Sequence, residues 1–209
     1  ALTGKPFAIN YLLPIRGLEL STKYAEPLFR ILQEENVRLV ITSGDSTEEG
    51  DRQIKRFKEE GYVIIHRDLS PTVESAIHAE SLGVDALIVT GHEAGGHLSE
   101  HRISTLAHVP QIVAAVSIPV IAAGGIIDGR GVKAALGMGA EGVYMGTRFI
   151  TVTESPASER AKALLLNTKS EDLVELETPV GTMTTIPTGH NIPAEMTDLT
   201  KIGQRYVGG

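Results

Sequence analysis

The stretch PVIAAGGIIDGRGVKAALGMGAEGVYMGT, residues 119–147, decides the fold. It opens with an apolar run (119–123) that ends in two glycines, continues with Asp128 as a helix start, and reaches a second glycine-ended run (142–146). Short apolar runs bounded by glycine predict buried strands, and the segment between them predicts a helix. Two buried strands joined by a helix are typical of a parallel β-α-β unit.

The same pattern recurs toward the N-terminus. Further strands are predicted at residues 6–13, 37–42, 62–66 and 85–90, and successive strands start on average about 27 residues apart, the length of one strand–helix unit. Between them lie helix signals: an apolar stripe at Ala25, Leu28, Phe29 and Leu32, and helix starts at Thr47, Ser70–Pro71, Val109–Pro110 and Ser155–Pro156. Six units are visible, and either a (β/α)8 barrel or a doubly wound sheet could contain them. The GxGxxA match at 129–134 argues only weakly for the doubly wound sheet, because it lies five residues beyond its strand and lacks the expected downstream acid.

Composition narrows the class of protein. The 209 residues include 19 basic and 26 acidic side chains, a net charge of −7, and no basic run, which argues against nucleic acid as a partner. The absence of cysteine excludes a disulfide scaffold, cysteine-ligated zinc and a thiolate nucleophile. The longest apolar stretch, residues 112–123, is too short to span a bilayer, and no signal peptide is visible. We therefore expect a cytoplasmic protein with no membrane partner, whose core is mainly aliphatic because only five Tyr and four Phe supply rings.

Glycines end the two strands of the opening stretch. Gly124 and Gly125 follow the first strand, Gly146 and Thr147 follow the second, and Gly125 and Gly146 are 21 residues apart. In (β/α)8 enzymes the loops after strands seven and eight form the usual phosphate site, where glycine allows main-chain N–H groups to approach phosphate oxygens. A simple turn explains one glycine pair, whereas glycines on consecutive strand ends favour a phosphate site.

The sequence GHEAGGH, residues 91–97, follows another predicted strand. His92 and His97 are five positions apart, about 140° around a helix, so they do not fit the zinc-binding HExxH pattern, and we expect no metal site. A glycine-rich loop that ends in histidine is suited to the edge of a flavin or substrate, with His97 as acid or base. His92, His101 and His108 are expected to be exposed loop histidines.

Four segments together resemble the nitronate monooxygenase family, formerly called 2-nitropropane dioxygenases: KPFAIN (5–10), GHEAGGH (91–97), PVIAAGGIIDGRG (119–131) and GAEGVYMGTRFI (139–150). The family consists of FMN-dependent TIM-type (β/α)8 barrels, and FMN-dependent enoyl-ACP reductases are close relatives. The resemblance implies that His97 is the catalytic histidine. It also implies an FMN site lined by Asn10, Thr90, Gly91, Gly95, Gly96, Gly124, Gly125, Tyr144, Met145, Gly146 and Thr147.

By this resemblance the visible strands are strands three to eight of the barrel. We expect the first two strands to be missing, so that the chain is either a fragment of a complete barrel or a reduced family member. Residues 1–166 are assigned to the FMN-binding barrel domain, and 167–209, where the periodicity is lost, to a loop-rich segment that packs on the barrel or forms a lid. Because parallel strands finish on one face, the predicted strand ends should lie at one end of the sheet: Asn10, Thr42, His66, Thr90, Ala123 and Gly146.

The resemblance implies oxidation of a small-molecule nitronate or nitroalkane by O2, with a carbonyl compound and nitrite as products. One alternative is an NAD(P)H-dependent enoyl-thioester reductase with the same FMN site. The other is a flavin-binding barrel without catalytic activity. A homodimer is a further expectation.

Overall fold

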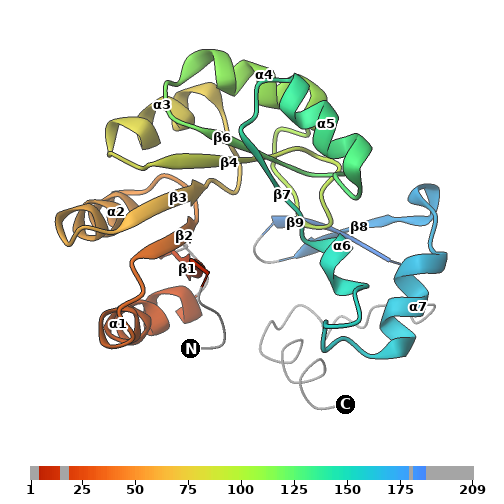
Figure 1. Ribbon diagram of the computed structural model, residues 1–209, viewed down its shortest axis with the longest axis horizontal. Coiled ribbons are helices and arrows are strands. Elements are labelled where there is room, and N and C mark those ends of the chain that lie inside the picture. The colour runs from red at the N-terminus through yellow and green to blue at the C-terminus, as the bar shows by residue number, and fades with distance from the viewer. Residues whose placement is uncertain (1–4, 15–18, 179–180, 187–209) are drawn as a thin grey trace.

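The computed structural model describes residues 5–14, 19–178 and 181–186. Strands and helices alternate through most of this range (Figure 1). The first half contains β1 (Ile9–Leu12), α1 (Glu19–Glu34), β2 (Leu39–Ser43), α2 (Glu48–Glu59), β3 (Val63–Arg67), α3 (Val73–Ser81) and β4 (Ala86–Thr90). The second half contains β5 (Gly96–His97), α4 (Thr105–Ala115), β6 (Val120–Ala123), α5 (Gly129–Gly137), β7 (Gly142–Tyr144), α6 (Thr147–Ile150), α7 (Glu159–Asn167), η1 (Ser170–Asp172), β8 (Val174–Thr178) and β9 (Gly181–Thr185).

All six strands predicted for the barrel lie in one parallel sheet, in the order β1-β2-β3-β4-β6-β7. A doubly wound sheet reverses its strand order at a switch point, whereas this order follows the chain without reversal. The strands form an arc, with α1 to α5 along its outer side (Figure 1). This arrangement confirms the predicted TIM-type architecture. In the part of the chain that the structure describes, β1 and β7 are not paired with each other, so the arc is open.

Local sequence signals explain where most helices begin. Thr47 and Asp128 are N-caps as predicted, and each side chain accepts a hydrogen bond from a main-chain N–H of the first turn. Two predicted starts were wrong: α4 begins at Thr105 rather than at 109–110, and α7 begins at Glu159 rather than at 155–156. In each case a serine N-cap, Ser104 or Ser158, decides the start instead of the nearby proline. Similarly, the N-cap of α3 is Thr72, two residues after the predicted start at Ser70.

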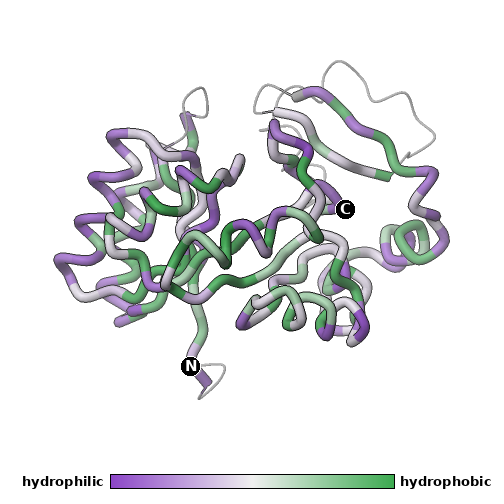
Figure 2. Tube along the Cα trace, turned by 90° about the horizontal axis from the view of Figure 1, so that it is seen from above, coloured by the Kyte–Doolittle hydropathy of each residue, from purple (hydrophilic) through white to green (hydrophobic). Residues whose placement is uncertain are grey.

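The core lies between the sheet and the outer helices. β4 is buried along its whole length, as expected for a central strand covered on both faces. Hydrophobic residues follow the strands, and hydrophilic residues lie mainly on the outer helices (Figure 2). The core is less purely aliphatic than expected, because Tyr11, Phe29, Phe57 and Tyr62 form a buried aromatic cluster, with the Tyr11 and Phe57 ring centroids 4.8 Å apart.

The C-terminal part of the described chain has more regular structure than the loop-rich segment that we expected. β8 and β9 form an antiparallel hairpin, and β5 extends it to a three-stranded sheet in which His97 pairs with Met183. The division of the chain at residue 166 stays a prediction, and residues 187–209 lie outside the described range. No helix among the described residues is long and apolar enough to cross a membrane.

Candidate functional site

The carboxyl ends of the six parallel strands form one edge of the sheet. Thr42 is paired with His66, and Thr90 with Ala123, which in turn is paired with Tyr144. The expectation that the strand ends lie together is therefore confirmed for the sheet as a whole. The glycine-rich loops that follow β4, β6 and β7 all leave from this edge.

Strand alternation divides the side chains at this edge between two faces. Thr42 and His66 share the face of Tyr11, which packs beneath the outer helices. The opposite, inner face carries Asn10, Ser43, Arg67, Thr90 and Tyr144. Sequence analysis ended two strands one residue early and thus missed Ser43 and Arg67. The signal that could have found them is the alternation of side chains in LVITS and VIIHR.

Hydrogen bonds connect neighbouring residues of the inner face. The Ser43 hydroxyl donates to Asn10 Oδ1 at 2.9 Å, and Arg67 Nε donates to Thr90 Oγ1 at 3.2 Å. Asn10 lies within β1 rather than at its end, with its side chain exposed. Two residues expected to line the cofactor, Asn10 and Thr90, therefore lie on the inner face of the sheet.

The loop 91–97 is attached to the start of α4. The Glu93 carboxylate accepts hydrogen bonds from the main-chain N–H of Thr105 at 2.8 Å and from its hydroxyl at 2.9 Å. The Thr105 hydroxyl lies 3.0 Å from the carbonyl oxygen of Gly124. A Cβ on Gly91 would overlap with Thr105, and a Cβ on Gly124 would lie 2.8 Å from the Thr105 hydroxyl. Close packing alone accounts for these two glycines, and their contact with a cofactor stays a prediction.

Other glycines of the expected site face open space or a neighbouring loop. Gly95, Gly125, Gly146 and Thr147 are exposed. A Cβ on Gly95 would lie 2.6 Å from Thr147 Oγ1, so the loops after β4 and β7 meet here. Gly125 has φ +68°, in the left-handed region, and a Cβ there would lie 3.0 Å from Glu93 Cβ. Nothing lies within 4 Å of a Cβ on Gly146. The structure thus brings together the predicted glycine ends and leaves room beside them.

His97 lies in β5 beside the hairpin. A Cβ on Gly181 of β9 would lie 2.9 Å from His97 Cε1, so glycine makes room for the ring. Burial lowers the pKa of His97, the charge of Arg67 lowers it further, and Glu100 opposes the shift. At neutral pH the imidazole is therefore held in its neutral form, which can accept a proton.

The hairpin is held to the loop by an acidic residue of β8. Glu175 lies 3.2 Å from His92 Nε2 and 2.8 Å from Arg102, both in the segment between β4 and α4. His92 is therefore a structural partner of the hairpin rather than a free loop histidine. The expectation for His108 was wrong: it lies in α4, is 1% exposed, and its Nδ1 has no hydrogen-bond partner among the described residues.

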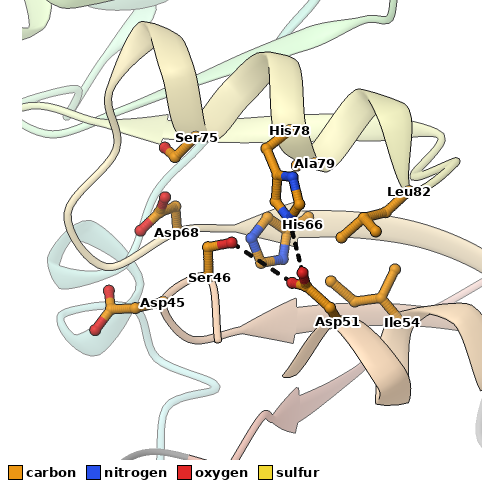
Figure 3. A pocket seen from close by; sticks show the side chains of 10 residues that line it. All are labelled: Asp45, Ser46, Asp51, Ile54, His66, Asp68, Ser75, His78, Ala79 and Leu82. Atoms are coloured by element: carbon orange, nitrogen blue, oxygen red, sulfur yellow. Dashed lines mark hydrogen bonds and ion pairs between the residues drawn. The ribbon is translucent and has the colours of Figure 1, made fainter. Parts of the chain in front are cut away.

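A second polar cluster lies on the outer face of the sheet, between α2 and α3 (Figure 3). His66 Nδ1 is 3.0 Å from Thr42 Oγ1, and His78 Nε2 is 2.7 Å from Asp51 Oδ2. Burial and the neighbouring Asp68 raise the pKa of Asp45 to about 6. The cavity among these residues is about 10 Å³, room for a single water molecule. This cluster is too small for an organic substrate.

Fold and site together define an α/β barrel-type protein whose functional loops lie at the carboxyl ends of the strands. The chain belongs to the nitronate monooxygenase family, whose sequence profile matches residues 1–188.

Individual relatives support the assignment to this family. A probable nitronate monooxygenase of Staphylococcus aureus (strain MSSA476) is 46% identical over 129 residues, which cover 58% of this chain and 36% of the relative. A FabK mutant from Thermotoga maritima is similar in structure with a TM-score of 0.80 and 30% identity, over 98% of this chain and 63% of that one. A nitroalkane oxidase from Streptomyces ansochromogenes has a TM-score of 0.69 and 27% identity, over 89% of this chain and 62% of that one. The chain spans about a third of the length of the curated relatives that it matches.

Proposed function

We propose that this protein is an FMN-dependent oxidoreductase that uses O2 to oxidise alkyl nitronates, or the parent nitroalkanes, to a carbonyl compound and nitrite. The observation that carries the proposal is the position of His97. It ends a glycine-rich loop, its pKa is lowered, and its loop lies against Thr147, the first residue of α6 after β7. Membership of the nitronate monooxygenase family and structural similarity to a nitroalkane oxidase support the same chemistry.

The residues at the edge of the sheet fit a flavin mononucleotide. Gly95, Gly125 and Gly146 are exposed at this edge; nothing lies within 4 Å of a Cβ on Gly146, which leaves room for a phosphate, and the positive φ of Gly125 favours glycine. Gly125, Gly146 and Thr147 would hold the phosphate, and Asn10 and Thr90 would line the ring. When bound, FMN supplies the two-electron oxidation and the reaction with O2, so the protein contributes binding, orientation and electrostatics.

His97 would act on the proton of the substrate. A neutral nitroalkane must lose its α-proton, and a neutral imidazole is the acceptor that the lowered pKa of His97 provides at neutral pH. A general base of this kind contributes typically about 10²–10⁴-fold in rate. A preformed nitronate has already lost this proton, so His97 would only stabilise its negative charge.

The experiment that tests the proposal is anaerobic mixing of the FMN-loaded protein with ethyl nitronate and, separately, with NADH. We expect the nitronate to bleach the visible flavin band and NADH to leave it unchanged. Bleaching by NADH alone would favour the enoyl-thioester reductase, which the sequence resemblance also includes. A yellow protein that neither compound bleaches would favour a flavin-binding barrel without activity.

A further inference from the structure

Among the described residues, Arg67 is the one cation on the inner face at the strand ends, and no sequence motif pointed to it. It is the last residue of β3, and alternation along the strand places its side chain with Ser43 and Thr90 rather than with His66. Its Nε donates to Thr90 Oγ1 at 3.2 Å, which fixes the orientation of the guanidinium plane. Arg67 therefore lies beside residues assigned to the proposed active site.

The charge of Arg67 is not neutralised by an ion pair among the described residues. Two described arginines are partly buried, Arg56 and Arg67. Arg56 follows the usual rule for buried charge, since its Nη1 lies 2.7 Å from Glu26. No carboxylate of the described chain lies within ion-pair distance of Arg67. The charge of the adjacent Asp68 acts on Arg67, but the Asp68 side chain lines the cavity on the opposite face. Burial lowers the pKa of Arg67, yet a guanidinium keeps its charge at any physiological pH.

A partly buried guanidinium that has no ion-pair partner among the described residues is suited to bind an anion, and its surroundings indicate where that anion would bind. The Arg67 side chain lies on the inner face, where Nε reaches Thr90 of β4 at 3.2 Å, and its charge acts on His97 of β5. Nε is used by Thr90, whereas Nη1 and Nη2 donate no hydrogen bond to a described residue. These free N–H groups form a planar fork, whose geometry matches a planar group with two oxygens.

We propose that Arg67 binds a planar two-oxygen anion of the substrate, either the nitronate group itself or a carboxylate that the substrate carries. This inference rests on the proposed function, because it assigns the substrate's negative charge to a particular residue of the same site. Arg67 thereby becomes a specificity-determining residue: the site binds the anionic nitronate more tightly than the neutral nitroalkane, which becomes an anion once His97 has accepted its α-proton. In this arrangement His97 accepts the proton of the substrate and Arg67 binds its negative charge.

The test begins with binding and needs no turnover. The dissociation constant of propionate, a simple carboxylate, is measured by ligand-observed NMR for the unaltered protein, Arg67→Gln, Arg67→Lys and the control Arg38→Gln. Arg38 precedes β2 at the opposite edge of the sheet and is exposed. We expect Arg67→Gln to raise the dissociation constant at least about tenfold, since a hydrogen bond to a charged group contributes about 1.5–3 kcal/mol. We expect Arg67→Lys, which keeps the charge but not the fork, to have a dissociation constant between those of the unaltered protein and Arg67→Gln. Arg38→Gln should have the same dissociation constant as the unaltered protein.

Kinetics then distinguish the two sources of the anion. KM and kcat are compared for the nitronates of 1-nitrobutane and of 4-nitrobutanoate, which differ in a terminal carboxylate. A higher KM for both in Arg67→Gln assigns the nitronate to Arg67, and a higher KM for 4-nitrobutanoate alone assigns the carboxylate. Both outcomes support the proposal.

Unaltered propionate binding in a folded Arg67→Gln would overturn the proposal, as would an unaltered protein that binds no propionate. Circular dichroism shows whether each variant is folded, and Arg67→Lys decides the question if Arg67→Gln is not. If the protein oxidises neither nitronate, the proposed function fails, whereas the propionate titration still decides the role of Arg67.

Discussion

Replacing Gly91 by alanine should destabilise the fold and disturb the loop that carries His97. A Cβ at this position would overlap with the Oγ1 and main-chain N of Thr105 and lie 2.5 Å from its Cα. Thr105 cannot easily move away, because Glu93 holds both its N–H and its hydroxyl, at 2.8 and 2.9 Å. The clash is therefore with backbone that is fixed in place.

The expected loss follows from this geometry. Overpacking costs typically about 1–3 kcal/mol, and a clash with fixed backbone belongs at the upper end, about 3 kcal/mol. For a chain of this size such a loss lowers the melting temperature by roughly 6–12 °C. Thermal unfolding followed by circular dichroism measures the shift.

A matched glycine provides the control. Gly137 lies at the end of α5, and nothing lies within 4 Å of a Cβ there. Gly137→Ala should melt at the same temperature as the unaltered protein or slightly higher, because alanine is favoured over glycine in a helix by roughly 0.5–1 kcal/mol. A Gly91→Ala protein that melts within about 2 °C of the unaltered protein would refute the close packing of Gly91 on Thr105.

Three further outcomes are expected. Gly146→Val should fold normally, because nothing lies within 4 Å of the added Cβ, but should purify without FMN; stoichiometric FMN in this variant would contradict the phosphate site. His97→Asn should lose about 10²–10⁴-fold of its turnover with neutral nitroalkanes and far less with preformed nitronates, and equal losses in oxygen-uptake assays would instead make His97 an anchor for the anion. The pKa of Asp45 is raised from 3.8 to about 6, so the native state binds its proton more tightly than the unfolded chain, and stability falls as the pH rises between those values. Asp45 is partly desolvated by its neighbours but keeps contact with solvent, and water screens its repulsion by Asp68. Asp45→Asn should therefore gain about 1 kcal/mol at pH 7 and much less at pH 4 in urea unfolding; an equal gain at both would contradict the assignment.

Much of the fold could be predicted from the sequence because its signals are local. Each of the six predicted barrel strands is a short apolar run, and each appears in the parallel sheet within three residues of its predicted bounds. The helix starts at Thr47 and Asp128 were predictable for the same reason, since a cap is satisfied by the next few residues. The glycine ends of β6 and β7 also follow from local sequence and become neighbours because their strands pair.

What the sequence did not reveal depends on contacts between distant segments. The hairpin of β8 and β9 forms through pairing with His97, about 85 residues earlier in the chain. The alternation in VELET was its local signal, but a weak one. Arg67 was missed because the predicted strand ended at residue 66, one residue too early, so the alternation that places Arg67 on the inner face was not followed to its end. His108 was expected on a loop because the start of α4 was placed too late.

The central claim is that nitronates are the substrates of this site, and the most direct measurement follows two quantities in one reaction. The FMN-loaded protein is mixed with ethyl nitronate in air-saturated buffer, and O2 consumption and nitrite formation are recorded together. We expect nitrite to accumulate as O2 is consumed, and expect His97→Asn to retain most of this rate because the nitronate is already deprotonated and needs no base. Flavin-loaded protein that consumes O2 with NADH but forms no nitrite from ethyl nitronate would contradict the account.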